Sequence, residues 1–317
     1  MNHWQFIHTK ISQKKAVYLL AVIQHKGSSP GRQGFKMVVS EDEIYGSIGG
    51  GVMEFNLVEY CKELIQQQQC VAFIKHQIHK GTITDGSGMI CSGEQTIIFY
   101  PLNHNDVALV THIQNTIAEG RSGVLTINPN LITFSTQGSI SSAYVYTHES
   151  ETDWNYQEHL NKKDTIYIIG SGHVGLATTK LFREMGFYTV VFDNRRKLNT
   201  FEANIYANEK KIISYDTIAK HFSNDNAAYV VIMTNKYTDD KLVLRKLLHK
   251  HFKFIGVLGS SAKLEVLFDV LKKEGFKDNQ LQQVNAPIGL KIHSQTPIEI
   301  AISIAGQIIA IKNKKEY

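Results

Sequence analysis

The sequence contains few cysteines and no long apolar segment. Its three cysteines, Cys61, Cys70 and Cys91, form no C-x-x-C pair, and an odd number does not suggest a disulfide framework. No apolar run reaches the roughly 18 residues that a membrane-spanning helix needs. The first residues, MNHWQFIHTK, lack the apolar core of a signal peptide. From these absences we expect a cytoplasmic protein that does not contact a membrane.

A strong charge of either sign is also missing. The formal net charge is +5, and charged residues make up 20% of the chain. This balance is compatible with an anionic ligand or an acidic partner surface, but it is too small and too scattered to indicate nucleic acid. Hydrophobic residues make up 43% of the 317 residues, which is typical of a globular protein with two domains.

A dinucleotide fingerprint stands near the middle of the chain. The apolar run at residues 166–169 leads into Gly170-Ser171-Gly172-His173-Val174-Gly175. An amphipathic segment and a second apolar run at residues 188–192 follow, and Asp193 closes the unit. This order predicts one βαβ unit, made of a strand, a glycine turn, a helix, a second strand and an acidic residue.

Each glycine of the fingerprint has its own physical role. Gly170 permits the tight turn out of the strand, and Gly172 lets a pyrophosphate approach the backbone because it has no Cβ. Gly175 allows the helix to pack close to the sheet. The helix N-terminus attracts an anion, and the Asp193 carboxylate can accept hydrogen bonds from ribose hydroxyls. A Rossmann fold that binds no nucleotide is the alternative, because fold does not fix function.

A second glycine turn, Gly49-Gly50-Gly51, precedes a helix predicted at about residues 52–69. Bare backbone N–H groups and a favourable helix dipole make this turn a second candidate anion site. A flexible turn is the alternative, but three glycines cost backbone entropy, which favours a ligand. Cys61 lies on the apolar stripe of the predicted helix and is expected in the core.

Cys91 lies in a loop rich in glycine and serine between two predicted strands. A thiolate there can ligate a soft metal such as molybdenum, or carry sulfur. The same cysteine can equally be a small apolar filler at the start of a strand, and the sequence alone does not choose between the two roles. His76 and His79 have no metal-binding spacing with Cys91, so we expect them at the surface.

The polar segment at residues 148–164 is the predicted linker between two domains. Residues 1–150 are expected to form a mixed α/β domain. Residues 163–317 are expected to form a Rossmann-like domain with a parallel sheet, because strands and helices alternate there. The Gly259-Ser260 turn follows the predicted strand at residues 254–258, at the edge where open α/β sheets bind ligands.

Short segments spread over nearly the whole chain follow the pattern of one family. They are GSSP at 27–30 with GFKM at 34–37, GSIGGGVME at 46–54, GMICSG at 88–93, GSGHVG at 170–175, GVLGS at 256–260, APIGL at 286–290 and SQTPIEIA at 294–301. In these segments, and in their order, the chain resembles the xanthine dehydrogenase accessory factors of the XdhC/CoxI family.

The resemblance implies a cytoplasmic chaperone rather than a self-sufficient enzyme. Such a protein binds molybdenum cofactor (molybdopterin), protects it while a terminal sulfur ligand is added, and passes it to an apo molybdenum hydroxylase of the xanthine dehydrogenase type. A cysteine desulfurase is the second implied partner, and a homodimer is the implied assembly. The expected cofactor-binding residues are Gly49, Gly50, Gly51, Cys91 (a candidate molybdenum ligand), Gly170, Gly172, His173, Gly175, Asp193, Gly259 and Ser260.

The chain departs from the family pattern in three places. Val52 follows the glycine run, where cysteine is common, and Ser92 replaces a glycine after Cys91. Ser261-Ala262 stands where the family commonly has two arginines, which are candidate anion-binding residues. These changes predict a difference in cofactor affinity or in the client enzyme.

An NAD(P)-dependent oxidoreductase is the alternative function, with the nucleotide at Gly170, Gly172, Gly175 and Asp193. The sequence places no catalytic pair of side chains beside a nicotinamide. His173 is a candidate proton donor, but an ordinary variable position is the interpretation that we prefer. No catalytic residue is therefore assigned, and an accessory factor is favoured over an enzyme.

Overall fold

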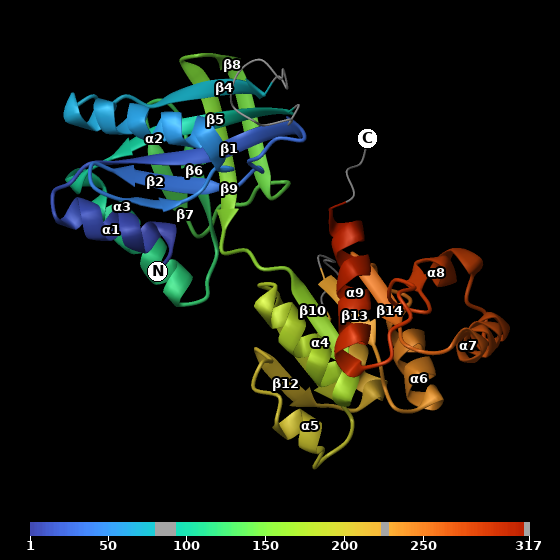
Figure 1. Ribbon diagram of the computed structural model, residues 1–317. Helices are drawn as coiled ribbons and strands as arrows, with labels where there is room; N and C mark the ends of the chain where they lie inside the picture. Colours follow the sequence, from blue (N-terminus) through green and yellow to red (C-terminus); the bar gives the residue numbers. More distant parts are fainter. Residues whose placement is uncertain (80–92, 223–227, 314–317) are drawn as a thin grey trace. The chain divides into compact units, whose positions relative to one another are not determined.

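The structure of the protein is a computed structural model that describes residues 1–79, 93–222 and 228–313. The chain forms two compact units, residues 1–162 and 163–317 (Figure 1). Each unit has its own sheets and its own hydrophobic clusters. None of the helices in the described ranges combines the length and the apolar character of a membrane span.

Unit 1 contains two antiparallel sheets. The five-stranded sheet has the order β3-β2-β1-β5-β4, and the four-stranded sheet has the order β7-β6-β9-β8. The strands are β1 Val17–Gly27, β2 Lys36–Ser40, β3 Ile44–Gly46, β4 Phe73–His79, β5 Gly93–Leu102, β6 Gly123–Ile127, β7 Ile132–Ser135, β8 Tyr144–Ser150 and β9 Asp153–Leu160. The helices are α1 His3–Ser12, α2 Gly51–Gln66, η1 His104–Asp106 and α3 Val107–Ala118.

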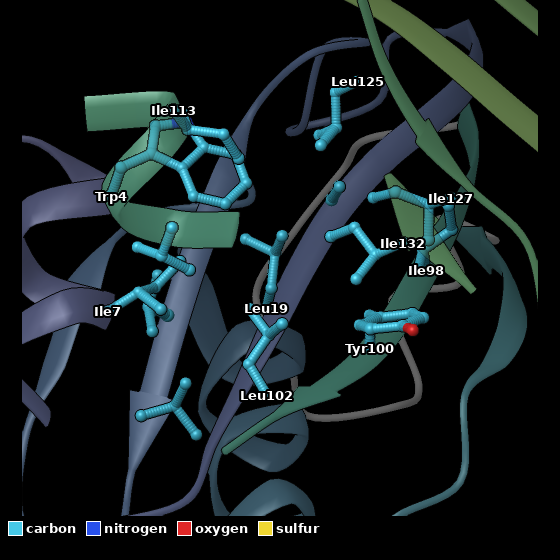
Figure 2. Close-up of a cluster of buried hydrophobic side chains, with 14 of the residues drawn as sticks. Trp4, Ile7, Leu19, Ile98, Tyr100, Leu102, Ile113, Leu125, Ile127 and Ile132 are labelled. Atoms are coloured by element: carbon cyan, nitrogen blue, oxygen red, sulfur yellow. The ribbon is translucent and has the colours of Figure 1, made fainter. Parts of the chain in front are cut away.

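Strand β1 lies at the centre of the five-stranded sheet because both of its faces are apolar. Its residues 17–23 form a continuous apolar run, and all of them are buried. One face packs in a cluster with α1, α3 and the four-stranded sheet, through side chains such as Leu19 and Leu125 (Figure 2). The other face packs against α2, where Cys61 is fully buried. Burial raises the pKa of the Cys61 thiol to about 12, and its predicted place in the core is confirmed.

The segment predicted as a linker, residues 148–164, is mostly a hairpin of unit 1. Strand β8 continues to Ser150, and β9 covers Asp153–Leu160. Along β9, buried residues alternate with less buried ones, which is the period of a strand that faces a core on one side. Most of this segment is therefore strand rather than linker, and the polar outward residues of β9 together with the buried Glu158 hide its alternation in the sequence. The boundary between the two units, at 162/163, does lie within the predicted segment. Unit 1 accordingly extends to residue 162 rather than ending at 150.

Unit 2 is built on a six-stranded sheet in which every strand pair is parallel, so the predicted Rossmann-like α/β fold is confirmed. The strands are β10 Thr165–Ile169, β11 Tyr188–Asp193, β12 Glu209–Ile212, β13 Ala228–Ile232, β14 Phe254–Val257 and β15 Val284–Asn285. The helices are α4 His173–Glu184, α5 Asn199–Glu202, η2 Tyr215–His221, α6 Tyr237–Leu247, α7 Ser261–Lys273, α8 Asp278–Gln282 and α9 Pro297–Lys312.

Helices cover both faces of this sheet, which is why its central strands β10, β11, β13 and β14 are largely apolar, whereas the edge strand β12 is charged and mostly exposed. One hydrophobic cluster contains residues of η2, α6, α7 and α8, and the other contains residues of α4 and α9. The strand order is β12-β11-β10-β13-β14-β15, so the direction of the chain across the sheet reverses between β10 and β13. Ligands of such sheets bind at the carboxyl ends of the strands beside this reversal. Four turns meet at that edge, at Gly170, Asp193, Thr234 and Gly259.

Candidate functional site

The fingerprint glycines form a tight turn between β10 and α4. Gly170 has a φ of +107°, and a Cβ on it would lie 2.4 Å from the carbonyl oxygen of Met233 at the end of β13. A Cβ on Gly175 would lie 2.2 Å from the carbonyl oxygen of Gly170, so α4 packs directly on the turn. Neither position has room for a side chain, in line with the packing roles that the motif predicts.

Gly172 differs from these two glycines because it faces open space. A Cβ there would meet no atom within 4 Å. Gly172 is the N-cap of α4, no side chain caps that helix, and no acidic residue lies in its first turn. Among the residues that the structure describes, the buried Ser171 hydroxyl has no hydrogen-bond partner, while His173 is exposed at the first position of the helix. The N-terminus of α4 is therefore open to an anion.

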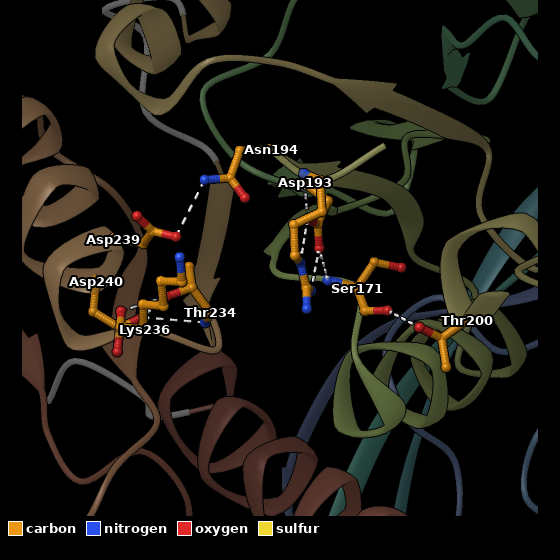
Figure 3. Close-up of polar contacts among 9 residues, drawn as sticks. Ser171, Asp193, Asn194, Thr200, Thr234, Lys236, Asp239 and Asp240 are labelled. Carbon is orange, nitrogen blue, oxygen red and sulfur yellow. Dashed lines mark hydrogen bonds and ion pairs between the residues drawn. The ribbon is translucent and has the colours of Figure 1, made fainter. Parts of the chain in front are cut away.

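Asp193, at the end of β11, lies beside this turn, but its carboxylate is enclosed. Oδ2 accepts hydrogen bonds from the Ser171 N–H and from Arg195 Nη2, each at 2.7 Å (Figure 3). Oδ1 accepts from the N–H and from Nε of Arg195, each at 2.9 Å. Burial alone would raise the pKa of Asp193, but the hydrogen bonds from Arg195 and Ser171 outweigh it and hold the pKa below its usual value. A ribose hydroxyl would have to displace one of these donors.

The Gly259-Ser260 turn at the end of β14 is supported by an ion pair between a buried carboxylate and a partly exposed lysine. Asp240 of α6 is fully buried, and its Oδ2 lies 2.6 Å from Lys263 Nζ. Its Oδ1 accepts hydrogen bonds from the N–H and the hydroxyl of Thr234, at 3.1 and 2.6 Å (Figure 3). Ser260 caps α7 by accepting a hydrogen bond from the Lys263 N–H at 3.3 Å. Lys263 thus places a cation at this turn, one position after Ser261-Ala262.

The triple-glycine turn ahead of α2 is filled by a carboxylate of the chain itself. Gly50 and Gly51 have φ values of +76° and +77°, which side chains rarely adopt. Glu54 Oε2 accepts hydrogen bonds from the N–H groups of Ile48 and Gly50 and from the Ser47 hydroxyl, each at 2.8 Å. Glu54 therefore occupies the position that we predicted for an external anion.

Three motif segments of unit 1 pack together through glycines. A Cβ on Gly31 would lie 2.2 Å from the carbonyl oxygen of Ile48, and a Cβ on Gly93 would lie 2.4 Å from the N–H nitrogen of Ser29. Gln95 of β5 stabilises the contact between β5 and the loop at 27–31, because its Oε1 accepts hydrogen bonds from the Ser29 hydroxyl at 3.0 Å and from the Gly31 N–H at 3.2 Å. The loop at 27–31, the turn at 46–51 and the start of β5 therefore meet at one end of the five-stranded sheet.

Cys91 lies outside the described residues, so its predicted role stays a prediction. The residues that the structure describes contain no group of three or more His, Cys, Asp or Glu side chains that could hold a metal ion. His76 is half-exposed and contacts Thr96 Oγ1 at 3.1 Å, as expected of a surface residue. Cys70 is exposed, and Cys61 is buried in the core.

Sequence reasoning missed four side chains that shape these turns. They are Glu54, Arg195, Asp240 and Lys263. A signal was present for Glu54, which follows the glycine run by one helical turn, and for Arg195, which stands two residues after the fingerprint acid. Asp240 and Lys263 come from different helices, and only the folded sheet brings them together.

Comparison with known proteins places both units. A model of the XdhC Rossmann domain matches residues 166–308, and a model of the XdhC and CoxI family matches residues 11–74. The chain is 21% identical over 310 residues to YqeB of Escherichia coli K12, an uncharacterized protein, in a match that covers 96% of this chain. That match spans only 45% of YqeB, so the chain is about half the length of that relative.

A second relative matches over nearly its full length. The chain is 20% identical over 334 residues to a probable xanthine dehydrogenase subunit of Bacillus subtilis 168, covering 99% of this chain and 98% of that protein. The crystal structure of a xanthine dehydrogenase from Bacillus halodurans has the same fold, with a TM-score of 0.72 at 22% identity, covering 100% of this chain and 97% of that one. With segments of both units matched by models of one family, the chain belongs to the XdhC and CoxI family.

Proposed function

We propose that this chain is a maturation factor for a molybdenum hydroxylase of the xanthine dehydrogenase type. In this role it binds molybdenum cofactor, supports addition of the terminal sulfur ligand, and passes the cofactor to the apo enzyme. Membership of the XdhC and CoxI family supports the maturation role. The name of the Bacillus subtilis relative supports a link to xanthine dehydrogenase.

The observation that carries the proposal is the meeting of the family motifs in unit 1. The loop at 27–31, the turn at 46–51 and Gly93 pack so closely that a Cβ on Gly31, Gly49 or Gly93 would overlap the neighbouring backbone. Close packing alone would explain such glycines inside a hydrophobic core. These glycines instead lie at one end of the sheet, beside polar side chains such as Gln95 and Ser29. We propose this end of the sheet as the cofactor site of unit 1.

The open turn of unit 2 fits a phosphate group. Gly172 leaves room for a phosphate, and the uncapped N-terminus of α4 offers N–H donors. The triple-glycine turn fits less well, because Glu54 already holds its N–H groups. The Gly170–Gly175 turn is therefore proposed as an anion site of unit 2 in its own right, which fits a phosphate group or the pyrophosphate of NAD(P). When bound, molybdenum cofactor supplies the metal centre that the client enzyme uses.

The proposal includes three partners and a role for Cys91. The partners are the apo hydroxylase, a cysteine desulfurase that supplies sulfur, and a second copy of this chain in a cytoplasmic homodimer. The Cys91 thiolate is proposed as the soft ligand of molybdenum, since Cys61 is buried with a raised pKa.

The first test is co-elution with the cofactor. The full chain is mixed anaerobically with free molybdenum cofactor and passed through gel filtration, and molybdenum and pterin are measured in the protein peak. We expect near-stoichiometric amounts of both. A folded protein that elutes without either would contradict the proposal.

The second test is the Cys91→Ala variant. We expect it to lose molybdenum from the co-eluting complex while its circular dichroism stays that of the parent, because the thiolate is the proposed metal ligand. Cys70→Ala is the matched control, since Cys70 is also a free cysteine and is exposed. Equal molybdenum in both variants would remove Cys91 from the site.

An NAD(P)-dependent oxidoreductase is the second candidate, and the open turn at Gly172 favours it. Two Tyr-x-x-x-Lys spacings occur in the sequence, at Tyr206–Lys210 and Tyr237–Lys241. Their lysines are engaged elsewhere, because Lys210 Nζ donates to backbone carbonyls of α5 and Lys241 Nζ pairs with Glu274 at 3.1 Å. Neither Tyr–Lys pair is therefore arranged for catalysis. Measured hydride transfer by the purified chain would be the evidence for the oxidoreductase function.

A further inference from the structure

We infer that the end of β11 recognises a ribose 2′-phosphate, so that the nucleotide of the Rossmann turn is NADP(H) rather than NAD(H). Arg195 and Arg196 are the specificity-determining residues. The inference rests on the proposed use of this turn by a phosphate-bearing ligand, and it does not depend on molybdenum cofactor.

The first step concerns the acid that normally selects NAD. A carboxylate at the end of the second strand binds the ribose hydroxyls of NAD by accepting their hydrogen bonds. Here Asp193 is fully buried, and each of its carboxylate oxygens already accepts two hydrogen bonds from Ser171 or Arg195. An unmodified ribose therefore finds no free acceptor on this side chain.

The second step concerns what the strand end presents instead. The Arg195 guanidinium is held by Asp193 through Nε and Nη2, and its side chain is 31% exposed. Within the described ranges, no hydrogen bond is formed by its Nη1. An arginine fixed along one edge and exposed along the other is suited to bind a phosphate, which accepts charge-assisted hydrogen bonds. The side chain of Arg196, next in the chain, is exposed.

The third step is the distance from the phosphate turn. Asp193 Oδ2 lies 2.7 Å from the Ser171 N–H nitrogen and 2.7 Å from Arg195 Nη2, so one oxygen atom joins the turn to the guanidinium. A nucleotide whose pyrophosphate sits at the N-terminus of α4 consequently places its adenosine ribose beside Arg195. The unpartnered Ser171 hydroxyl lies in the same turn.

The local charge favours an additional phosphate as well. The end of β11 and the loop after it carry Arg195, Arg196 and Lys197, and the nearby carboxylates are Asp193 and Asp239. Asp239 of α6 accepts a hydrogen bond from Asn194 Nδ2 at 3.1 Å, across the end of β10 (Figure 3). The strand end and its loop thus carry three cationic residues against two carboxylates, a balance that attracts the dianionic 2′-phosphate.

The experiment measures binding of NADP+ and NAD+ to the full chain by titration calorimetry at one fixed ionic strength. We expect NADP+ to bind at least about tenfold more tightly than NAD+, since a charge-assisted contact to phosphate is worth that factor. Equal affinities, tighter binding of NAD+, or no binding of either nucleotide would overturn the inference.

Variants assign the effect to the arginines. Arg196→Ala is expected to lower the affinity for NADP+ about tenfold while leaving the affinity for NAD+ unchanged. Arg183→Ala is the matched control, because it removes the same charge from the far end of α4. Arg195→Ala is expected to lower the affinity for NADP+ as well, but to raise the affinity for NAD+, because it frees acceptor positions on the Asp193 carboxylate. An Arg196→Ala variant that discriminates as well as the Arg183→Ala control would exclude Arg196.

Because these titrations contain no molybdenum cofactor, their result is independent of the co-elution test. A chain that prefers NADP+ but does not retain molybdenum would keep this inference and refute the chaperone proposal. A chain that retains molybdenum but binds the two nucleotides equally would do the reverse.

Discussion

Gly172 and Gly175 stand three positions apart in one motif, yet a methyl group has opposite consequences at the two sites. At Gly172 it would enter open space, and the backbone φ of −73° suits any residue. At Gly175 it would collide with the carbonyl oxygen of Gly170 at 2.2 Å. The first glycine therefore serves an approaching ligand, and the second serves packing.

We predict that Gly172→Ala keeps the stability of the parent and loses nucleotide binding. The added Cβ costs no contact in the free protein but fills the space beside the helix N-terminus. Thermal unfolding without ligand checks the first part, and calorimetric titration with NADP+ checks the second. Gly175→Ala is the contrasting variant, expected to lower the unfolding temperature. Undiminished NADP+ binding by Gly172→Ala would show that the ligand does not approach this glycine.

Asp193 gives the stability of unit 2 a dependence on pH. Its pKa in the folded protein lies below the usual value, so the carboxylate contributes stability that is present above about pH 4, the ordinary Asp pKa, and is lost as pH falls through the folded pKa. We predict that the stability difference between the parent and Asp193→Asn is largest near neutral pH and shrinks below about pH 4. Urea unfolding at several pH values measures it, and a difference that stays constant down to pH 3 would contradict the prediction.

At the scale of single residues, the sequence predicted glycine roles well and hydrogen-bond partners poorly. Gly170 and Gly175 could be assigned because the motif fixes their neighbours in the chain. The partners of Asp193 and of the triple-glycine turn could not, because several acceptors and donors compete for each position. In the structure, Arg195 pairs with Asp193 and Glu54 binds the triple-glycine turn. The spacing of these residues in the sequence does not indicate that they, rather than a ligand, fill these positions.

Among the elements, β9 carries a buried charge that joins the two sheets of unit 1. Its Glu158 side chain is 2% exposed and lies 2.8 Å from Nζ of Lys36 on β2, whose side chain is 11% exposed. Glu158 Oε2 also accepts a hydrogen bond from the Tyr156 hydroxyl at 3.1 Å, and burial together with this carboxylate raises the Tyr156 pKa. A charge pair this deeply buried depends on both partners.

We predict that Glu158→Gln destabilises unit 1 by about 3–5 kcal/mol, because it leaves the Lys36 ammonium buried without a counter-charge. Chemical denaturation followed by a probe in unit 1, such as Trp154 fluorescence, measures the change. Glu119→Gln is the control, since Glu119 pairs with Arg121 at an exposed position where ion pairs contribute little. Equal stability of the two variants would show that the buried pair contributes no more than a surface pair.

The same strand explains the largest error of the sequence analysis. Periodicity predicted β1 and the βαβ unit because their apolar runs are continuous. It failed for β9, whose inward residues are Trp154, Tyr156, Glu158 and Leu160. An element is recognisable from sequence when its buried face is apolar, and it is hidden when a buried charge interrupts that face.

For the whole molecule, the sequence predicted the α/β class and the Rossmann half, because alternating strands and helices leave few arrangements. The candidate site was predicted only as a set of segments. The seven family-like segments lie far apart in the chain, and only the structure shows that the loop at 27–31 and the turn at 46–51 share one end of a sheet. No sequence pattern indicated which side chains from other elements complete each turn.

Glu54 has one further consequence for any anion that reaches the triple-glycine turn. Its carboxylate is tethered to the same chain, so it competes for the Ile48 and Gly50 N–H groups at a local concentration that dilution cannot lower. The observed affinity of an external anion is then the difference between two free energies, one for its own binding and one for releasing Glu54. Glu54 therefore acts as a tethered competitive inhibitor of anion binding at its own turn. A weakly binding anion such as chloride is expected to have low affinity for this turn.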